Sequence, residues 1–342
     1  MFSRIIGQER AKKFLKQAMA KDKMPHAYLF TGIPGIGKTT MAMALAMALN
    51  CREPQGGDSC GRCACCRQIL GGNSPDFVVI EPQGQFIKIE QVRELNRSLG
   101  FAPMGNCRVS VVRRAEAMTD EAANSFLKTL EEPPPGNIFV LSTTEPYDLL
   151  PTIVSRCQRV AFGPIPVKDM SNWFVKEMDK DEETAGILAN ISGGSLGRAI
   201  EISKTDYLDR RQEWLLRVLR LPGMPKDKVM ELAVECATGE GKRGFKSPGY
   251  LGSPIMEMLF TWKTWYRDLM LLSAGGPPDQ IINGDFSHKL KKMAEMTIMK
   301  NLIESVLIIN RAEIDLKRNR NVSLVMEHTI LTLSRLAGRG RA

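Results

Sequence analysis

The stretch Gly32-Ile33-Pro34-Gly35-Ile36-Gly37-Lys38-Thr39 matches the phosphate-binding pattern G-x-x-x-x-G-K-[ST] in full. It follows a short apolar run, residues 27–31, and opens an Ala-, Met- and Leu-rich segment, residues 38–49, that predicts a helix. Glycines let backbone N–H groups wrap around phosphates, the helix N-terminus adds positive potential, and the lysine reaches the outer phosphates. The sequence therefore predicts a nucleotide site, with Mg²⁺ at the threonine hydroxyl, formed by Gly32, Gly35, Gly37, Lys38, Thr39 and Thr40.

Short apolar runs alternate with helical patterns on both sides of this loop. Besides residues 27–31, such runs predict strands at residues 76–80, 108–112, 138–142 and 159–162. Apolar residues spaced by threes and fours predict helices at residues 8–22, 89–99 and 120–132. Strands that are apolar along nearly their whole length indicate a parallel sheet covered on both faces. The sequence therefore predicts an α/β fold around the phosphate loop.

The strand pattern ends near Phe162, and the following Gly163-Pro164-Ile165-Pro166 is typical of a linker. The remaining residues predict helices, with glycine-rich interruptions at 239–252 and 273–278. The length is also too great for one small domain. We therefore expect three domains: an α/β P-loop domain at 1–163 with an insertion at 51–66, a small helical lid at 164–205, and an all-helical domain at 206–342.

The strand predicted at residues 108–112 ends without the acids that nucleotide hydrolysis needs. In P-loop ATPases of this type one carboxylate there holds the Mg²⁺ shell and a second polarises the attacking water. Here Arg113-Arg114 follows the strand, and strand geometry gives no reason to place the later Glu116 at the metal. The pattern therefore predicts a chain that holds phosphate without hydrolysing it, unless an acid comes from elsewhere.

Four cysteines are closely spaced in the insertion as Cys51-x₈-Cys60-x₂-Cys63-x₂-Cys66. In a cytosolic chain such clustering favours zinc over disulfides, and four protein ligands leave no open position for a substrate. We expect a structural zinc site in which spacing favours Cys66 over the neighbouring Cys65. Reduced thiols without a metal are the alternative.

The composition indicates a globular protein with a basic surface. The 342 residues are 43% hydrophobic and 25% charged, and the net charge is +9. This balance argues against global disorder and favours contact with nucleic acid or an acidic protein face, with a solvated basic surface as the alternative. Neither a run of about 18 apolar residues nor an apolar signal region at residues 1–7 is present, so we expect a cytoplasmic protein.

Several longer motifs occur with these features in a fixed order. They are Ile6-Gly7-Gln8, residues 25–30, the phosphate loop, the cysteine insertion, residues 124–134 and Ser155-Arg156-Cys157. In this order the chain resembles the clamp-loader branch of the AAA+ ATPases, by specific motifs over residues 4–200 and by length and helical pattern beyond them. It is most similar to delta-prime-type subunits, because gamma/tau-type motors carry acids where Arg113-Arg114 stands. Its intact phosphate loop departs from the most degenerate delta-prime chains.

The resemblance implies roles for residues outside the phosphate loop. Arg156 would be an arginine finger that points in trans into the ATP site of a neighbouring gamma-type subunit. Thr143 and Thr144 would be sensor residues at the end of the fourth strand. A second sensor is not expected to function, because Arg198 stands one position later after Gly194-Ser195-Leu196 than in gamma-type chains.

The resemblance also implies partners. The domain at 206–342 would be a collar that joins gamma/tau- and delta-type subunits in a hetero-pentamer, which loads a sliding clamp on primer-template DNA during replication. In this role the chain is a stator of the DNA polymerase III holoenzyme, with structural zinc, and with ATP and Mg²⁺ binding left open. An active gamma/tau-like motor is the main alternative. A DNA- or zinc-binding regulator unconnected to clamps is another, although no aromatic-studded basic stripe is present.

Overall fold

A parallel sheet organises the first half of the chain. The computed structural model describes residues 1–21, 23–242 and 253–338, and among them five strands form one sheet. The strand order is β2-β3-β4-β1-β5, and every hydrogen-bonded pair is parallel. The strands are β1 (Ala27–Thr31), β2 (Phe77–Ile80), β3 (Arg108–Arg113), β4 (Asn137–Thr143) and β5 (Gln158–Ala161). The predicted α/β fold with a parallel sheet is confirmed, and so are the five strand positions.

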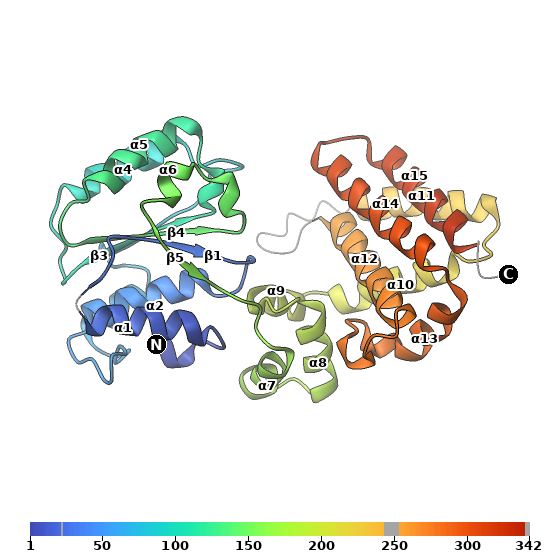
Figure 1. Cartoon of the computed structure of the whole chain (residues 1–342), viewed down its shortest axis with the longest axis horizontal. Coiled ribbons are helices and arrows are strands. Elements are labelled where there is room, and N and C mark those ends of the chain that lie inside the picture. The colour runs from blue at the N-terminus through green and yellow to red at the C-terminus, as the bar shows by residue number, and fades with distance from the viewer. Residues whose placement is uncertain (22, 243–252, 339–342) are drawn as a thin grey trace. The chain divides into compact units, whose positions relative to one another are not determined.

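Helices cover both faces of this sheet, as its apolar strands predict (Figure 1). One face carries α1 (Glu9–Ala20) and α2 (Lys38–Asn50). The other face carries α4 (Ile89–Leu99), α5 (Asp120–Glu131) and the short α6 (Pro151–Val154). A further short helix, α3 (Ala64–Leu70), begins within the cysteine-rich insertion.

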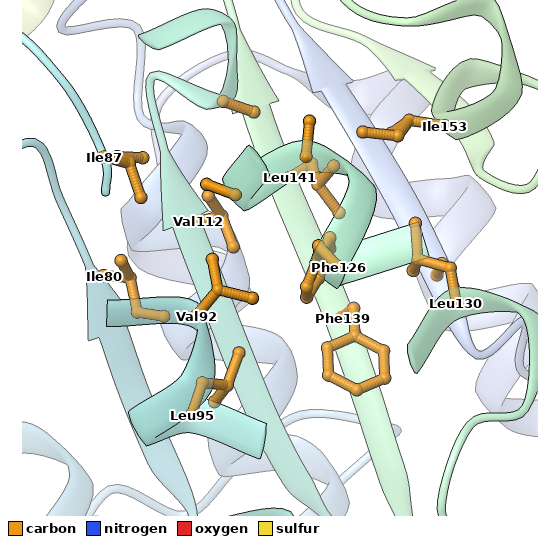
Figure 2. Packing of buried hydrophobic residues seen from close by; sticks show 14 of the residues in the cluster. Ile80, Ile87, Val92, Leu95, Val112, Phe126, Leu130, Phe139, Leu141 and Ile153 are labelled. Carbon is orange, nitrogen blue, oxygen red and sulfur yellow. The ribbon is translucent and has the colours of Figure 1, made fainter. Parts of the chain in front are cut away.

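The main core of the sheet lies under α4 and α5 (Figure 2). Phe126 of α5 and Phe139 of β4 are fully buried and meet edge to face, with ring centroids 5.5 Å apart. Val92 and Leu95 from α4 belong to the same cluster, together with Val112 from β3. Burying one such side chain contributes about 1.5–3 kcal/mol, so this layer fixes the two helices on the sheet.

The parallel register brings the carboxyl ends of the strands to one edge of the sheet. Thr31 at the end of β1 pairs with Thr143 at the end of β4, and Ser142 pairs with Arg113 at the end of β3. Ligands of open parallel sheets bind outside the carboxyl ends of the strands. The loops that follow these three strands are therefore where a nucleotide site is expected.

Helices make up the rest of the described chain. They are α7 (Val167–Met178), α8 (Glu182–Ile191), α9 (Leu196–Ser203), α10 (Tyr207–Arg220), α11 (Lys226–Lys242), α12 (Pro254–Ser273), α13 (Ser287–Met296), α14 (Met299–Lys317) and α15 (Val322–Ala337). The interruption predicted at 273–278 follows the end of α12. Most of the interruption predicted at 239–252 lies outside the described residues.

The chain divides into two compact units. The first contains Met1–Met170 together with Gly194–Gly197, and the second contains Ser171–Gly193 and Arg198–Ala342. This division keeps the α/β part together. It places residues 171–193 and 198–205 with 206–342, and residues 164–170 and 194–197 with the α/β part. The three-domain boundaries therefore stay a prediction.

The second unit has a helical core of its own. Trp214, Trp262 and Trp265 are fully buried, and the Trp262 indole N–H donates to the Trp214 carbonyl oxygen at 2.8 Å. Buried Asp268 accepts hydrogen bonds from the backbone N–H groups of Ile282 and Asn283. In the described part of the chain, no helix is both long and apolar enough to cross a membrane.

Candidate nucleotide site, arginine and metal-binding insertion

The predicted phosphate loop leaves β1 and runs directly into α2. Gly32 has a φ of +149°, and a Cβ there would lie 2.6 Å from the backbone oxygen of Phe162, the residue that follows β5. Gly37 is the N-cap of α2 with a φ of +97°, which disfavours any residue with a side chain. Gly35 also has a positive φ, and Thr39 lies in the first turn of α2. This loop therefore has the backbone that a phosphate cradle needs.

Lys38 lies along its own loop. Its ammonium group donates to the backbone oxygens of Gly32 and Ile33, the latter at 3.0 Å. Burial lowers the pKa of Lys38 to about 8, while the charge of Glu116 opposes this shift and that of Arg113 adds to it. The lysine and these two side chains therefore share one electrostatic environment. Thr40, two positions after Lys38 in α2, is exposed.

The predicted sensor residues end β4 beside the loop. The Thr143 carbonyl oxygen accepts a hydrogen bond from the Gly32 N–H at 3.2 Å. The Thr143 hydroxyl oxygen accepts another from the Glu145 N–H at 3.0 Å. The Thr144 hydroxyl donates to Oε1 of Glu116 at 3.4 Å. Thr143 therefore fixes the start of the phosphate loop, and Thr144 holds a carboxylate.

Glu116 is a residue that the sequence did not place at this site. It lies in a single 3-10 turn, Ala115–Ala117, after β3. Arg114 precedes this turn in the left-handed region, with a φ of +52°, and so redirects the chain. A residue other than glycine in this conformation is uncommon, and no sequence pattern here signals it.

Arg113, the last residue of β3, and Arg114, which follows it, differ in their surroundings. Arg113 donates to Oε2 of Glu81 at 2.7 Å, an ion pair beyond the end of β2. Arg114 is exposed. Neither guanidinium donates a hydrogen bond to the phosphate loop in the described structure, and Arg113 is held by the carboxylate of Glu81.

A short segment from later in the chain packs on the phosphate loop within the first unit. The Ser195 hydroxyl donates to the Pro34 carbonyl oxygen at 2.7 Å, and the Gly197 N–H donates to the Gly35 carbonyl oxygen at 2.9 Å. In the second unit Arg198 pairs with buried Glu257 and lies over the Phe260 ring. The residue that would be a second sensor is therefore engaged with its own unit.

Arg156 lies just after α6, which begins at Pro151, a favoured first helical residue. Its guanidinium donates to the Thr152 carbonyl oxygen at 3.0 Å and to Oε1 of Glu131 at 2.7 Å. The Arg156 side chain is 35% exposed and that of Glu131 is 50% exposed. The arginine is therefore held in a defined direction while part of it stays open to a partner.

The insertion brings four cysteine sulfurs together. The Sγ atoms of Cys51, Cys60, Cys63 and Cys66 all lie within 4.8 Å of one another, whereas Cys65 is outside the group. A tetrahedral zinc–thiolate centre with Zn–S distances of about 2.3 Å separates its sulfurs by about 3.8 Å. The four sulfurs therefore fit a metal such as zinc.

Backbone N–H groups surround these sulfurs in the way that thiolates need. The Cys60 N–H donates to the Cys51 sulfur at 3.2 Å, and the Cys63 N–H donates to the Cys60 sulfur at 3.3 Å. The N–H groups of Arg62 and Cys63 lower the pKa of the Cys60 thiol. Donors to sulfur stabilise the deprotonated form, which is the form that binds metals.

The same insertion holds the first residues of the chain. Asp58 accepts from the amino group of Met1 at 2.5 Å and from the N–H groups of Phe2 and Ser3 at 3.0 Å each. Although burial opposes it, these donors hold the pKa of Asp58 well below its usual range. Phe2 is fully buried. The cysteine-rich segment is therefore joined to the N-terminal residues.

Comparisons with known proteins agree with this architecture. A sequence model of the family described as DNA polymerase III, delta subunit, matches residues 7–166. The DNA polymerase III subunit delta′ of Bacillus subtilis is 30% identical over 95% of this chain and 96% of its own length. That of Escherichia coli is 35% identical over 55% of this chain and 57% of its own. The tau subunit of Bacillus subtilis is 28% identical over 97% of this chain and 61% of its own.

The fold and the phosphate-loop motif define an α/β P-loop type of domain followed by helices. The chain belongs to the delta-prime family of DNA polymerase III subunits. The resemblance inferred from the motifs is thus confirmed.

Proposed function

We propose that this chain is a stator subunit of a bacterial clamp loader, which acts in DNA replication in the cytoplasm. It presents Arg156 in trans to the ATP site of a neighbouring subunit. The single observation that carries this proposal is the fixed, partly exposed guanidinium of Arg156, held by Glu131 and by the Thr152 carbonyl. Family membership supports the same role.

The chemistry of an arginine suits this task. Negative charge spreads over the transferred phosphoryl group at the transition state, and a guanidinium can donate to it through a rigid fork of N–H groups. Arginine fingers are worth ~10³–10⁵ in rate in other systems. Glu131 directs the Arg156 side chain without burying it, so an incoming phosphate can replace this carboxylate as the acceptor.

The chain's own phosphate loop is expected to bind nucleotide with little turnover. Lys38 and Thr39 would hold the phosphates and Mg²⁺, which supplies charge neutralisation when bound. The loop's positive-φ glycines and the nearby carboxylate of Glu116 fit such a group. Arg113 and Arg114 stand where hydrolytic acids would be, so hydrolysis should be negligible.

Zinc is the metal that we propose for the four cysteine sulfurs. Four thiolates from one short segment suit a tetrahedral ion with no open position. The ion would fix the insertion, and through Asp58 the insertion would fix the N-terminal residues. Its role is therefore structural.

We propose gamma/tau- and delta-type subunits as direct partners in a hetero-pentamer. Apolar side chains of α14 remain exposed, namely Ile303, Leu307 and Ile314, at 44%, 61% and 45%. An exposed apolar helix face supports subunit contact through the C-terminal helices. A sliding clamp and primer-template DNA would be reached through the complex, and the net charge of +9 suits an acidic partner.

An active motor of the gamma/tau type is the second candidate. The intact phosphate loop and the similarity to a tau subunit favour it. ATP binding and hydrolysis by the isolated chain separate the two, with Lys38→Ala as the control. The stator predicts binding without turnover. Steady turnover that Lys38→Ala abolishes would instead support the motor.

A further inference from the structure

Glu116 carries a buried carboxylate oxygen that lacks a partner among the described residues. Its Oε1 accepts from the Thr144 hydroxyl, while its Oε2 has essentially no solvent exposure and no hydrogen bond. Leaving a buried charged oxygen unpaired costs free energy, so native proteins pair such atoms with a donor, a water or an ion. The orphaned oxygen therefore calls for a cation or a donor at this point.

The surroundings of Glu116 show where that partner would lie. The charge of Glu116 acts on Lys38, and Thr144 follows the last residue of β4, the strand beside β1. The carboxylate is thus positioned between the end of β4 and the phosphate loop. Anionic groups at this place oppose a bare phosphate and favour one that is accompanied by a divalent cation.

Arg113 does not neutralise this carboxylate directly. Its guanidinium is paired with Glu81 at 2.7 Å. Two ammonium hydrogen bonds of Lys38 go to backbone oxygens of its own loop. Lys38 and Arg113 are therefore both engaged with other acceptors.

We propose that Glu116 supplies the carboxylate of the magnesium–nucleotide site, holding a water of the Mg²⁺ shell beside the phosphate loop. It would replace the acids that are missing at positions 113 and 114 for metal binding. It would not polarise an attacking water, because the Thr144 hydroxyl holds its Oε1 beside the end of β4. The proposal rests on the proposed nucleotide binding by this loop, and it makes the subunit a holder of Mg²⁺–nucleotide.

The proposal predicts different changes in the affinity for ADP alone and in the affinity for Mg²⁺–ADP. A purely structural glutamate would change both affinities together. Without Mg²⁺, the carboxylate repels the phosphates; with Mg²⁺, it stabilises the metal's water shell. Glu116→Gln keeps the size and the acceptor for Thr144 but removes the charge. It should therefore tighten or leave unchanged the binding of ADP in a chelator, and weaken the binding of Mg²⁺–ADP.

The experiment is a titration of the full chain with ADP, with and without Mg²⁺. The measured quantity is the Mg²⁺ gain, meaning the Kd in chelator divided by the Kd with Mg²⁺. Loss of an outer-shell partner typically costs 10–100-fold in metal affinity, so Glu116→Gln should lower the gain about tenfold or more. Glu116→Asp, which keeps the charge, should retain more of the gain than Glu116→Gln.

The matched control is Glu94→Gln, the same change at an exposed position of α4, on the opposite face of the sheet from α2. It should leave the Mg²⁺ gain unaltered. An equal loss of affinity with and without Mg²⁺ in Glu116→Gln would overturn the proposal, and so would a wild-type chain that binds ADP equally well in both conditions. If the wild-type chain binds ADP without a Mg²⁺ gain and Lys38→Ala abolishes this binding, the phosphate loop remains the nucleotide site. Only the role proposed for Glu116 is then rejected.

Discussion

Arg156 and Glu131 form an ion pair with 2.7 Å between Nη2 and Oε1, which joins the end of α5 to the turn after α6. Both residues belong to motifs that the sequence contains in a fixed order, residues 124–134 and Ser155-Arg156-Cys157. The pair therefore links these two motifs through one partly exposed guanidinium. Glu131 accepts from Nη2 of the arginine, and the Thr152 carbonyl oxygen accepts from Nη1.

Glu131→Gln should loosen Arg156 with little effect on folding. Exposed ion pairs contribute about 0.2–1 kcal/mol, so the free energy of unfolding should fall by less than about 1 kcal/mol. The clamp-stimulated ATPase rate of an assembled loader should fall, but less than with Arg156→Ala, because the guanidinium is still present. Urea denaturation and ATPase assays measure the two effects. A loss of about 3 kcal/mol or more would indicate that the pair is part of a buried network instead.

Removing the metal should release the insertion. Cys63→Ser should bind no zinc, whereas the wild-type chain should bind one ion, as measured by elemental analysis. Loss of a structural metal removes binding free energy from the folded state, so the melting temperature should fall. Hydrogen exchange at Phe2 and Ser3 should also rise, because Asp58 holds their N–H groups.

Cys65→Ser is the matched control for this experiment. Cys65 lies next to Cys66 in sequence, yet its sulfur is outside the four-sulfur group. The variant should keep its zinc and its melting temperature. Zinc loss in Cys65→Ser with retention in a Cys66→Ser chain would show that the ligand set is wrong.

Through Lys38, a rise in pH should change the folding stability and the affinity for ADP in opposite directions. Burial lowers the pKa of Lys38 to about 8 from the ordinary 10.5. Between these values the unfolded chain binds more protons than the folded chain, so the contribution of Lys38 to stability rises with pH. Phosphate binding needs the ammonium form, so ADP affinity should fall as pH rises above about 8. Titrations from about pH 7 to 9.5 with wild type and Lys38→Ala measure this fall. A wild-type profile as flat as that of the variant would contradict the assignment.

Much of the fold follows from local patterns. The nearly all-apolar runs predicted the five strands, and Thr119 caps α5 by accepting from the Ala122 N–H. Pro133-Pro134-Pro135 follows the end of that helix. The phosphate loop and the cysteine spacing could also be predicted, because each pattern places its groups within one short stretch of the chain.

The sequence could not reveal features that depend on distant segments or unusual backbone. Arg114 adopts a left-handed conformation that is rare for arginine, and this turn is what precedes Glu116 at the site. Ser195 reaches the phosphate loop from 161 positions away. Asp58 binds backbone N–H groups at the start of the chain, 56 positions from Phe2. Spacing rules say nothing about such contacts.

The central claim is that Arg156 acts in the ATP site of a neighbour. The most direct measurement is the DNA- and clamp-stimulated ATPase rate of a reconstituted loader that contains Arg156→Ala, with assembly checked by gel filtration. Arg159→Ala, which removes an exposed arginine of β5, is the matched control. We expect Arg156→Ala to assemble normally and to lose hydrolysis at one interface, by ~10³-fold or more at that site. A fully assembled loader with an unchanged ATPase rate would contradict the account.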